Sequence, residues 1–196
     1  MKEQELKIIL SKNEYTSLIN DLSLDSHPKI KVQENHYFDT KDHKFLKSKE
    51  MLRVRKTNVE TVVTIKRNAK IIDGYFECEE LEKSFAKCSW EKSNLIDFIF
   101  DRDQSFFIDK DLIYLGCLKN IRTIFDWRGF KLEVDQSKFS NEMIDYELEC
   151  ETISPQKLLE ILDENTFLKK KNISYQSESK FKRFLKHCSS DYKSSV

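Results

Sequence analysis

Short runs in which apolar and polar residues alternate recur along most of the chain. A period of two places successive side chains on opposite faces, which is the pattern of a β-strand. The predicted strands are Lys2–Leu10, His36–Asp39, Met51–Lys56, Thr61–Arg67, Tyr75–Glu82, Asn120–Trp127, Gly129–Asp135 and Asp145–Thr152. Eight short strands favour an antiparallel barrel or sandwich.

Four other segments carry apolar residues at helical spacing. The first helix is expected after Ser11, which forms a possible capping box with Glu14. The others are expected over Trp90–Phe100, from Pro155 onward after the N-cap Ser154, and near Ser177–His187. We therefore predict a mainly β, α+β fold with one domain over residues 1–188 and a disordered polar tail over residues 189–196.

One face of most predicted strands is almost entirely charged. The residues that share such faces are Glu3, Glu5 and Lys7; Arg53 and Arg55; Thr64 and Lys66; Glu77 and Glu79; Lys131, Glu133 and Asp135; and Glu147, Glu149 and Glu151. Taken singly, each face is typical of a sheet with one side in water. Taken together, they separate by sign: the strands at 3–5, 77–79, 133–135 and 147–151 are rich in acids, and those at 53–55 and 66 are rich in bases. This segregation admits a second interpretation, in which the sheet closes and the charged faces point inward.

A charged interior would need a charged guest, because buried like charges repel and desolvation is costly. A triphosphate with divalent cations would satisfy both signs. Arginine and lysine would contact phosphate oxygens, and carboxylates would hold hard cations.

Composition narrows the function classes. The 34 basic and 34 acidic residues balance, which argues against a general nucleic-acid or membrane-surface binder. Three glycines cannot build a Walker loop, so side chains would have to hold any phosphate. Five cysteines without a CxxC pair argue against a disulfide framework or zinc site and favour the cytoplasm. The first residues lack the apolar run of a signal peptide.

Several short motifs follow one another in an order that resembles the CYTH superfamily, the triphosphate tunnel metalloenzymes. The matching elements are Glu3-Gln-Glu5-Leu-Lys7 (ExExK), His36-Tyr-Phe-Asp39-Thr40, Leu52-Arg53-Val-Arg55, Thr64-Ile-Lys66, Arg122, Leu132-Glu-Val-Asp135, Glu147-Leu-Glu149, and Ser179-Lys180 with Arg183. ExExK alone would be a weak signal in a chain so rich in these residues. The ordered series covers nearly the whole chain.

The resemblance implies a closed eight-stranded antiparallel β-barrel with a charged lumen and helices outside. It implies that Lys7, Arg53, Arg55, Lys66, Arg122 and Lys180 bind the phosphates, and that Glu3, Glu5, Asp135, Glu147 and Glu149 hold Mg²⁺ or Mn²⁺. Glu5 and Lys7 are the predicted catalytic residues. Glu77, Glu79 and Glu151 match less closely, and Arg183 could lie on the outer face of the last helix.

Metal-dependent hydrolysis of an inorganic, thiamine or nucleoside triphosphate is the predicted reaction. A class IV adenylate cyclase and a non-catalytic polyphosphate or nucleotide-binding module remain alternatives. We expect Asp39, Thr40, His36 and Trp127 to have structural roles. No nucleic acid or membrane partner is expected, and both a monomer and a homodimer remain open.

Overall fold

The computed structural model describes residues 2–72, 75–86, 92–102, 112–169 and 173–187. The strands are β1 (Lys2–Leu10), β2 (Lys29–Thr40), β3 (Met51–Lys56), β4 (Glu60–Ile72), β5 (Tyr75–Ala86), β6 (Leu112–Trp127), β7 (Phe130–Lys138), β8 (Ile144–Glu151) and β9 (Ser174–Tyr175). The helices are α1 (Lys12–Asp25), α2 (Lys44–Lys47), α3 (Lys92–Arg102), α4 (Pro155–Asn165) and α5 (Lys180–His187). The predicted tail, residues 189–196, lies outside the described residues.

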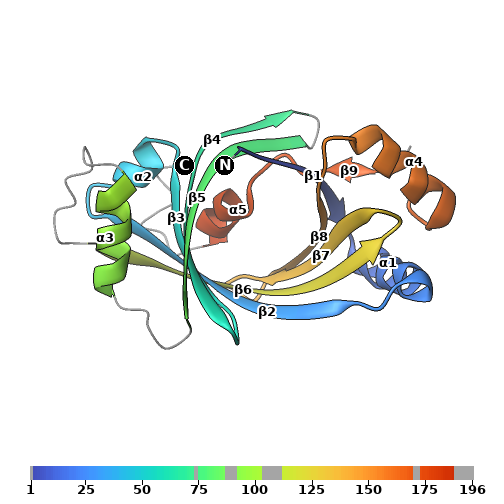
Figure 1. The fold of residues 1–196 in the computed structure, drawn as a ribbon, viewed down its shortest axis with the longest axis horizontal. Helices are drawn as coiled ribbons and strands as arrows, with labels where there is room; N and C mark the ends of the chain where they lie inside the picture. The colour runs from blue at the N-terminus through green and yellow to red at the C-terminus, as the bar shows by residue number, and fades with distance from the viewer. Residues whose placement is uncertain (1, 73–74, 87–91, 103–111, 170–172, 188–196) are drawn as a thin grey trace.

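The strands form one antiparallel sheet that closes on itself (Figure 1). Their order is β5-β4-β3-β2-β6-β7-β8-β1-β9, and β5 also pairs with the first half of β1. This second pairing closes β1–β8 into an eight-stranded barrel, and β9 adds a short strand beyond residue 7 of β1. The prediction of a closed antiparallel barrel is confirmed.

The apolar faces of the strands point outward and are covered by helices (Figure 1). Even-numbered residues of β1 such as Leu6 and Ile8 pack in one cluster with α1 and α4, and Leu52 and Val54 of β3 pack in another with α3. Burial of these side chains, at roughly 25 cal/mol per Å² of apolar area, holds the helices to the barrel. The charged faces of β1, β3, β4, β7 and β8 therefore point into the lumen.

Two local hydrogen-bond arrangements fix helix starts. Ser11 and Glu14 form the predicted capping box at α1, in which each side chain bonds the backbone N–H of the other residue. The short helix α2 was not predicted. It starts where the buried Asp39 carboxylate accepts hydrogen bonds from the backbone amides of Thr40, Phe45 and Leu46. Asp39 thus has the structural role expected of it.

Helix α5 differs from the other helices because it lies within the ring of strands (Figure 1). The ring of Phe184 packs 4.6 Å from that of Tyr37 on β2. Gly116 on β6 lets Phe184 approach closely, since a Cβ there would lie 3.1 Å from the phenyl ring. This packing directs the polar side chains Lys180 and Arg183 of α5 toward the strands β7 and β8.

Candidate functional site

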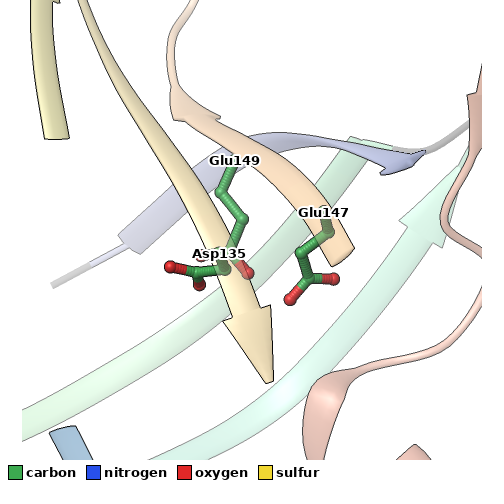
Figure 2. Close-up of side chains that lie close together, drawn as sticks. All are labelled: Asp135, Glu147 and Glu149. Atoms are coloured by element: carbon green, nitrogen blue, oxygen red, sulfur yellow. The ribbon is translucent and has the colours of Figure 1, made fainter. Parts of the chain in front are cut away.

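Three buried carboxylates meet in the lumen. Asp135 lies on β7, and Glu147 and Glu149 lie on β8 (Figure 2). The strand register places Asp135 directly opposite Glu147, and the two-residue period puts Glu149 on the same face. One carboxylate oxygen from each residue lies within 4.8 Å of the others, and no side chain of the three is more than 6% exposed.

Basic side chains compensate this buried negative charge. Arg122 on β6 donates two hydrogen bonds to Asp135, at 2.8 and 2.6 Å, and a third to Glu149. The Lys7 ammonium lies 2.5 Å from Glu149 and 2.8 Å from Glu5. Lys180 contacts all three carboxylates of the cluster. We call Glu5, Glu133, Asp135, Glu147 and Glu149 the carboxylate wall.

These contacts keep Asp135 and Glu149 ionised despite their burial. Burial alone would raise the pKa of Asp135, but Arg122 and Lys180 outweigh it and lower that pKa to about 2. The pKa of Glu149 is also lowered, because Lys180, Lys7 and Arg122 outweigh its desolvation. Conversely, burial would lower the pKa of Lys7, but Glu149 and Glu5 raise it above its ordinary value.

Asp145, at the edge of this wall, behaves differently. Burial raises its pKa to about 6, although Arg183 lies 3.0 Å away and acts in the opposite direction. Arg183 also donates a 2.7 Å hydrogen bond to Glu147. Arg183 therefore faces the lumen and braces Glu147, which excludes the alternative that it lies on an outer helix face.

The opposite side of the barrel carries the basic wall, Arg53, Arg55 and Lys66 on β3 and β4. In the closed strand order, β2 and β6 separate these strands from β7 and β8 on one side, and β5 and β1 on the other. Arg53 contacts Thr64, Glu80 and Glu82, and Lys66 lies 3.4 Å from Glu80.

Arg55 is the least paired of the lumen's basic side chains within the described part of the chain. Its Nε donates to the Asn35 amide oxygen at 2.9 Å, and no carboxylate among the described residues forms a salt bridge with it. Burial, then the charges of Arg53 and Arg122, lower the pKa of Arg55 to about 10. The Nε of Arg53 is also buried without a hydrogen-bond partner among the described residues. The basic wall therefore has unused capacity for an anion.

The lumen brings together most of the residues singled out in the sequence. Those whose side chains it gathers are Glu5, Lys7, Arg53, Arg55, Lys66, Arg122, Asp135, Glu147, Glu149 and Lys180. Glu3 pairs through its backbone with Cys78, and its side chain lies outside the described part of the chain. Glu151 lies exposed at the end of β8.

The prediction that Glu77 and Glu79 share the charged inner face is wrong. Glu79 is exposed and pairs with Arg67, while Glu77 accepts a hydrogen bond from Gln4. The odd-numbered side chains of β5 point outward because Leu81 packs in the outer cluster. The inner face of β5 instead carries the acids Glu80 and Glu82.

Sequence reasoning missed Glu80 and Glu82. They too are spaced by two residues, so the signal was present. The inner face of β5 begins with Phe76, whose ring lies 5.0 Å below the Lys7 ammonium. Because Phe76 is apolar and yet points inward, the alternation of β5 did not show which of its residues face the lumen.

A model of the CYTH domain matches residues 1–185 of the chain. The chain belongs to the CYTH family. The Bacillus subtilis (strain 168) protein named "Putative triphosphatase YjbK" is 30% identical over 156 residues, which are 76% of each chain.

Two solved structures resemble this CYTH chain in fold. HpAC1 from Hippeastrum, described as a "putative adenylyl cyclase" with "a dominant triphophatase activity", superposes with a TM-score of 0.80 at 26% identity, covering 97% of this chain and 99% of its own. A "putative adenylate cyclase" from Bacillus halodurans gives a TM-score of 0.66 at 26% identity over 93% and 98% of the two chains.

The donors of this CYTH barrel fit a hard divalent cation. Asp135, Glu147 and Glu149 offer only carboxylate oxygens, the ligands that Mg²⁺ and Mn²⁺ prefer over nitrogen or sulfur. The Oε1 atom of Glu147 is buried and accepts no hydrogen bond among the described residues, although the Lys180 ammonium lies 2.6 Å from it. Within the same residues, no helix is long and apolar enough to cross a membrane.

Proposed function

We propose that this CYTH protein hydrolyses a triphosphate in its lumen with Mg²⁺ or Mn²⁺. One observation carries the proposal: a buried trio of carboxylates faces a wall of arginines that lacks a full set of anionic partners. A triphosphate with a divalent cation supplies charge of both signs: the cation would meet the carboxylate wall, and the phosphates would meet the basic wall.

Asp135, Glu147 and Glu149 would hold the cation, with Glu3 and Glu5 as further predicted ligands. When bound, such a cation neutralises phosphate oxygens and lowers the pKa of a coordinated water. Arg53, Arg55 and Lys66 would hold the phosphate chain from the opposite wall, helped by Arg122 and Lys180. Arginine suits this role because its planar fork can donate to two phosphate oxygens.

Phosphoryl transfer depends mainly on positioning and on charge stabilisation. Lys7 lies beside Glu5, at 2.8 Å, and would neutralise charge that develops near the scissile bond. One carboxylate of the wall would accept the proton of the attacking water. Glu5, with 13% of its side chain exposed, is the member of the wall that contacts Lys7 from outside the buried trio.

A class IV adenylate cyclase is the second candidate, favoured by the description of the Bacillus halodurans protein, whereas the description of HpAC1 gives a dominant triphosphatase activity. It would use the same lumen to bind ATP and would release pyrophosphate. A non-catalytic binding module would need the basic wall and would have little use for three buried carboxylates.

A panel of substrates and metals separates these functions. Tripolyphosphate, thiamine triphosphate and ATP are each incubated with Mg²⁺ or Mn²⁺, and phosphate, pyrophosphate and cyclic AMP are measured. We expect phosphate release that EDTA stops. Cyclic AMP with pyrophosphate would favour the cyclase, and metal-independent binding without any product would favour the binding module.

A further inference from the structure

The Lys180 ammonium lies at the centre of the carboxylate trio. Its Nζ is 2.6 Å from Asp135 Oδ2, 2.6 Å from Glu147 Oε1 and 3.4 Å from Glu149 Oε1. The side chain of Lys180 is 14% exposed. The same three carboxylates are those whose oxygens converge closely enough to share one ion.

An ammonium and a divalent cation cannot both use these oxygens. A metal ion would need them at about 2.0–2.6 Å, the range of Mg²⁺ and Ca²⁺ bonds to oxygen. It would then lie within a few ångströms of the Lys180 nitrogen, where like charges in a buried site repel strongly. The two cations are therefore alternative occupants of one position.

Of the three contacts that Lys180 makes with the trio, those with Glu147 and Glu149 are ion pairs without a hydrogen bond. Lys180 Nζ lies close to Glu147 Oε1, yet that oxygen accepts no hydrogen bond among the described residues. The hydrogen bond that Lys180 does form goes to Asp135. A metal ion, which does not depend on the direction of N–H bonds, could bond the oxygens of Asp135 and Glu147 at the same time.

The lysine can leave without moving its helix. Lys180 is the first residue of α5 and reaches the trio through a flexible four-carbon chain. Phe184 anchors the rest of the helix against Tyr37, and Arg183 anchors it to Glu147 and Asp145. Only the side chain of Lys180 has to swing.

We propose that the Lys180 ammonium holds the metal position as an internal counterion, and that the metal must displace it, which frees it to bind the phosphate chain. This inference rests on the proposed metal site. It makes Lys180 a competitor of the metal when substrate is absent and a ligand of the phosphates once the metal has entered.

Titration calorimetry with Mn²⁺ and no triphosphate tests the competition. Lys180→Met removes the charge and keeps most of the side-chain volume, so it should bind Mn²⁺ about tenfold or more tightly than the wild type. Lys182→Met is the matched control, since Lys182 lies on the same helix, is 51% exposed and pairs with Glu178. Its affinity should equal that of the wild type.

Unchanged or weaker Mn²⁺ binding by a folded Lys180→Met variant would overturn the proposal while leaving the metal site intact. No Mn²⁺ binding by wild type or variant would overturn the metal site as well. If Lys180→Met fails to fold, a measurement on the wild-type protein tests the displacement of Lys180. A ¹⁵N signal of the Lys180 ammonium should change when Mg²⁺ saturates the protein, and an unchanged signal would contradict displacement.

Discussion

The carboxylate wall and the basic wall of the lumen balance their charges in different ways. On the carboxylate wall, Glu149 is shared by Lys7, Arg122 and Lys180, and Asp135 is shared by Arg122 and Lys180. On the basic wall, Arg55 has an amide oxygen as its hydrogen-bond partner and no salt bridge among the described residues. The carboxylate wall is neutralised by neighbouring basic side chains, whereas the basic wall can still bind an anion.

Because of this difference, we expect the two walls to contribute differently to folding stability and to substrate binding. Breaking a buried ion pair leaves an uncompensated charge, which costs much more than removing a charge that had no counterion. We therefore expect the carboxylate wall to be sensitive in both folding and activity. We expect the basic wall to be sensitive mainly in substrate binding.

The largest effect is expected from Glu147→Gln. The change keeps the shape but removes the charge of a fully buried member of the trio, so phosphate release from tripolyphosphate should fall about a hundredfold or more. Glu79→Gln, on the outer face of the same barrel, is the control and should keep wild-type turnover. Equal rates for wild type and Glu147→Gln would remove Glu147 from the site.

Folding stability should distinguish the two walls directly. Arg122→Met leaves Asp135 and Glu149 short of a counterion and should lower the free energy of unfolding by about 3–5 kcal/mol. Arg55→Met removes a charge that has no salt bridge among the described residues and should change the free energy of unfolding by less than about 1 kcal/mol. Chemical denaturation of both variants measures the contrast, and equal losses would contradict it.

Sequence alone predicted the strands β1 and β3 with their observed bounds, because charged residues occupy every second position through the middle of each strand. It also placed β2 and β6 correctly but started them too late, at His36 and Asn120 instead of Lys29 and Leu112. Residues Ile30 and Val32 of β2 are exposed, so the early part of that strand has no buried face to mark it.

The alternation placed Asp135, Glu147 and Glu149 on charged faces because β7 and β8 keep their two faces separate, and the resemblance to the CYTH superfamily implied that these three, with Glu3 and Glu5, hold the metal. The face of β5 was mispredicted because Phe76 and Cys78 occupy inward positions beside β1, where apolar residues imitate an outer face. The position of α5 inside the barrel depends on packing between Phe184, Tyr37 and Gly116. Such a contact between distant segments has no local pattern.

Substrate binding should respond to Arg55, whose hydrogen-bond partner among the described residues is the Asn35 amide oxygen. Arg55→Met should raise the KM for tripolyphosphate about tenfold, since a hydrogen bond to a charged group contributes roughly 1.5–3 kcal/mol. Arg128→Met, at an exposed residue paired with Asp25, serves as control and should leave KM unchanged. A KM for Arg55→Met within twofold of wild type would mean that the anion binds elsewhere.

The final prediction concerns pH and Asp145. Its pKa of about 6 in the fold lies above the ordinary value of 3.8, so the fold takes up this proton more readily than the unfolded chain. This contribution to stability is present below about pH 4 and is lost as pH rises through 6.

The free energy of unfolding of wild type should therefore fall between pH 4.5 and pH 7, while that of Asp145→Asn should lack this loss. Relative to wild type, the variant should gain on the order of 1–3 kcal/mol over this range. Denaturation of both proteins at the two pH values measures this difference. The opposite sign would mean that the Arg183 pair, rather than burial, governs Asp145.

The position of a bound metal and triphosphate tests the assignment of the two walls most directly. Crystals soaked with Mn²⁺ and a non-hydrolysable triphosphate would reveal the metal by its anomalous scattering. We predict a Mn²⁺ peak bonded to Asp135, Glu147 and Glu149, with phosphate oxygens on Arg53 and Arg55. A metal bound outside the lumen, or phosphates that avoid the basic wall, would contradict the account.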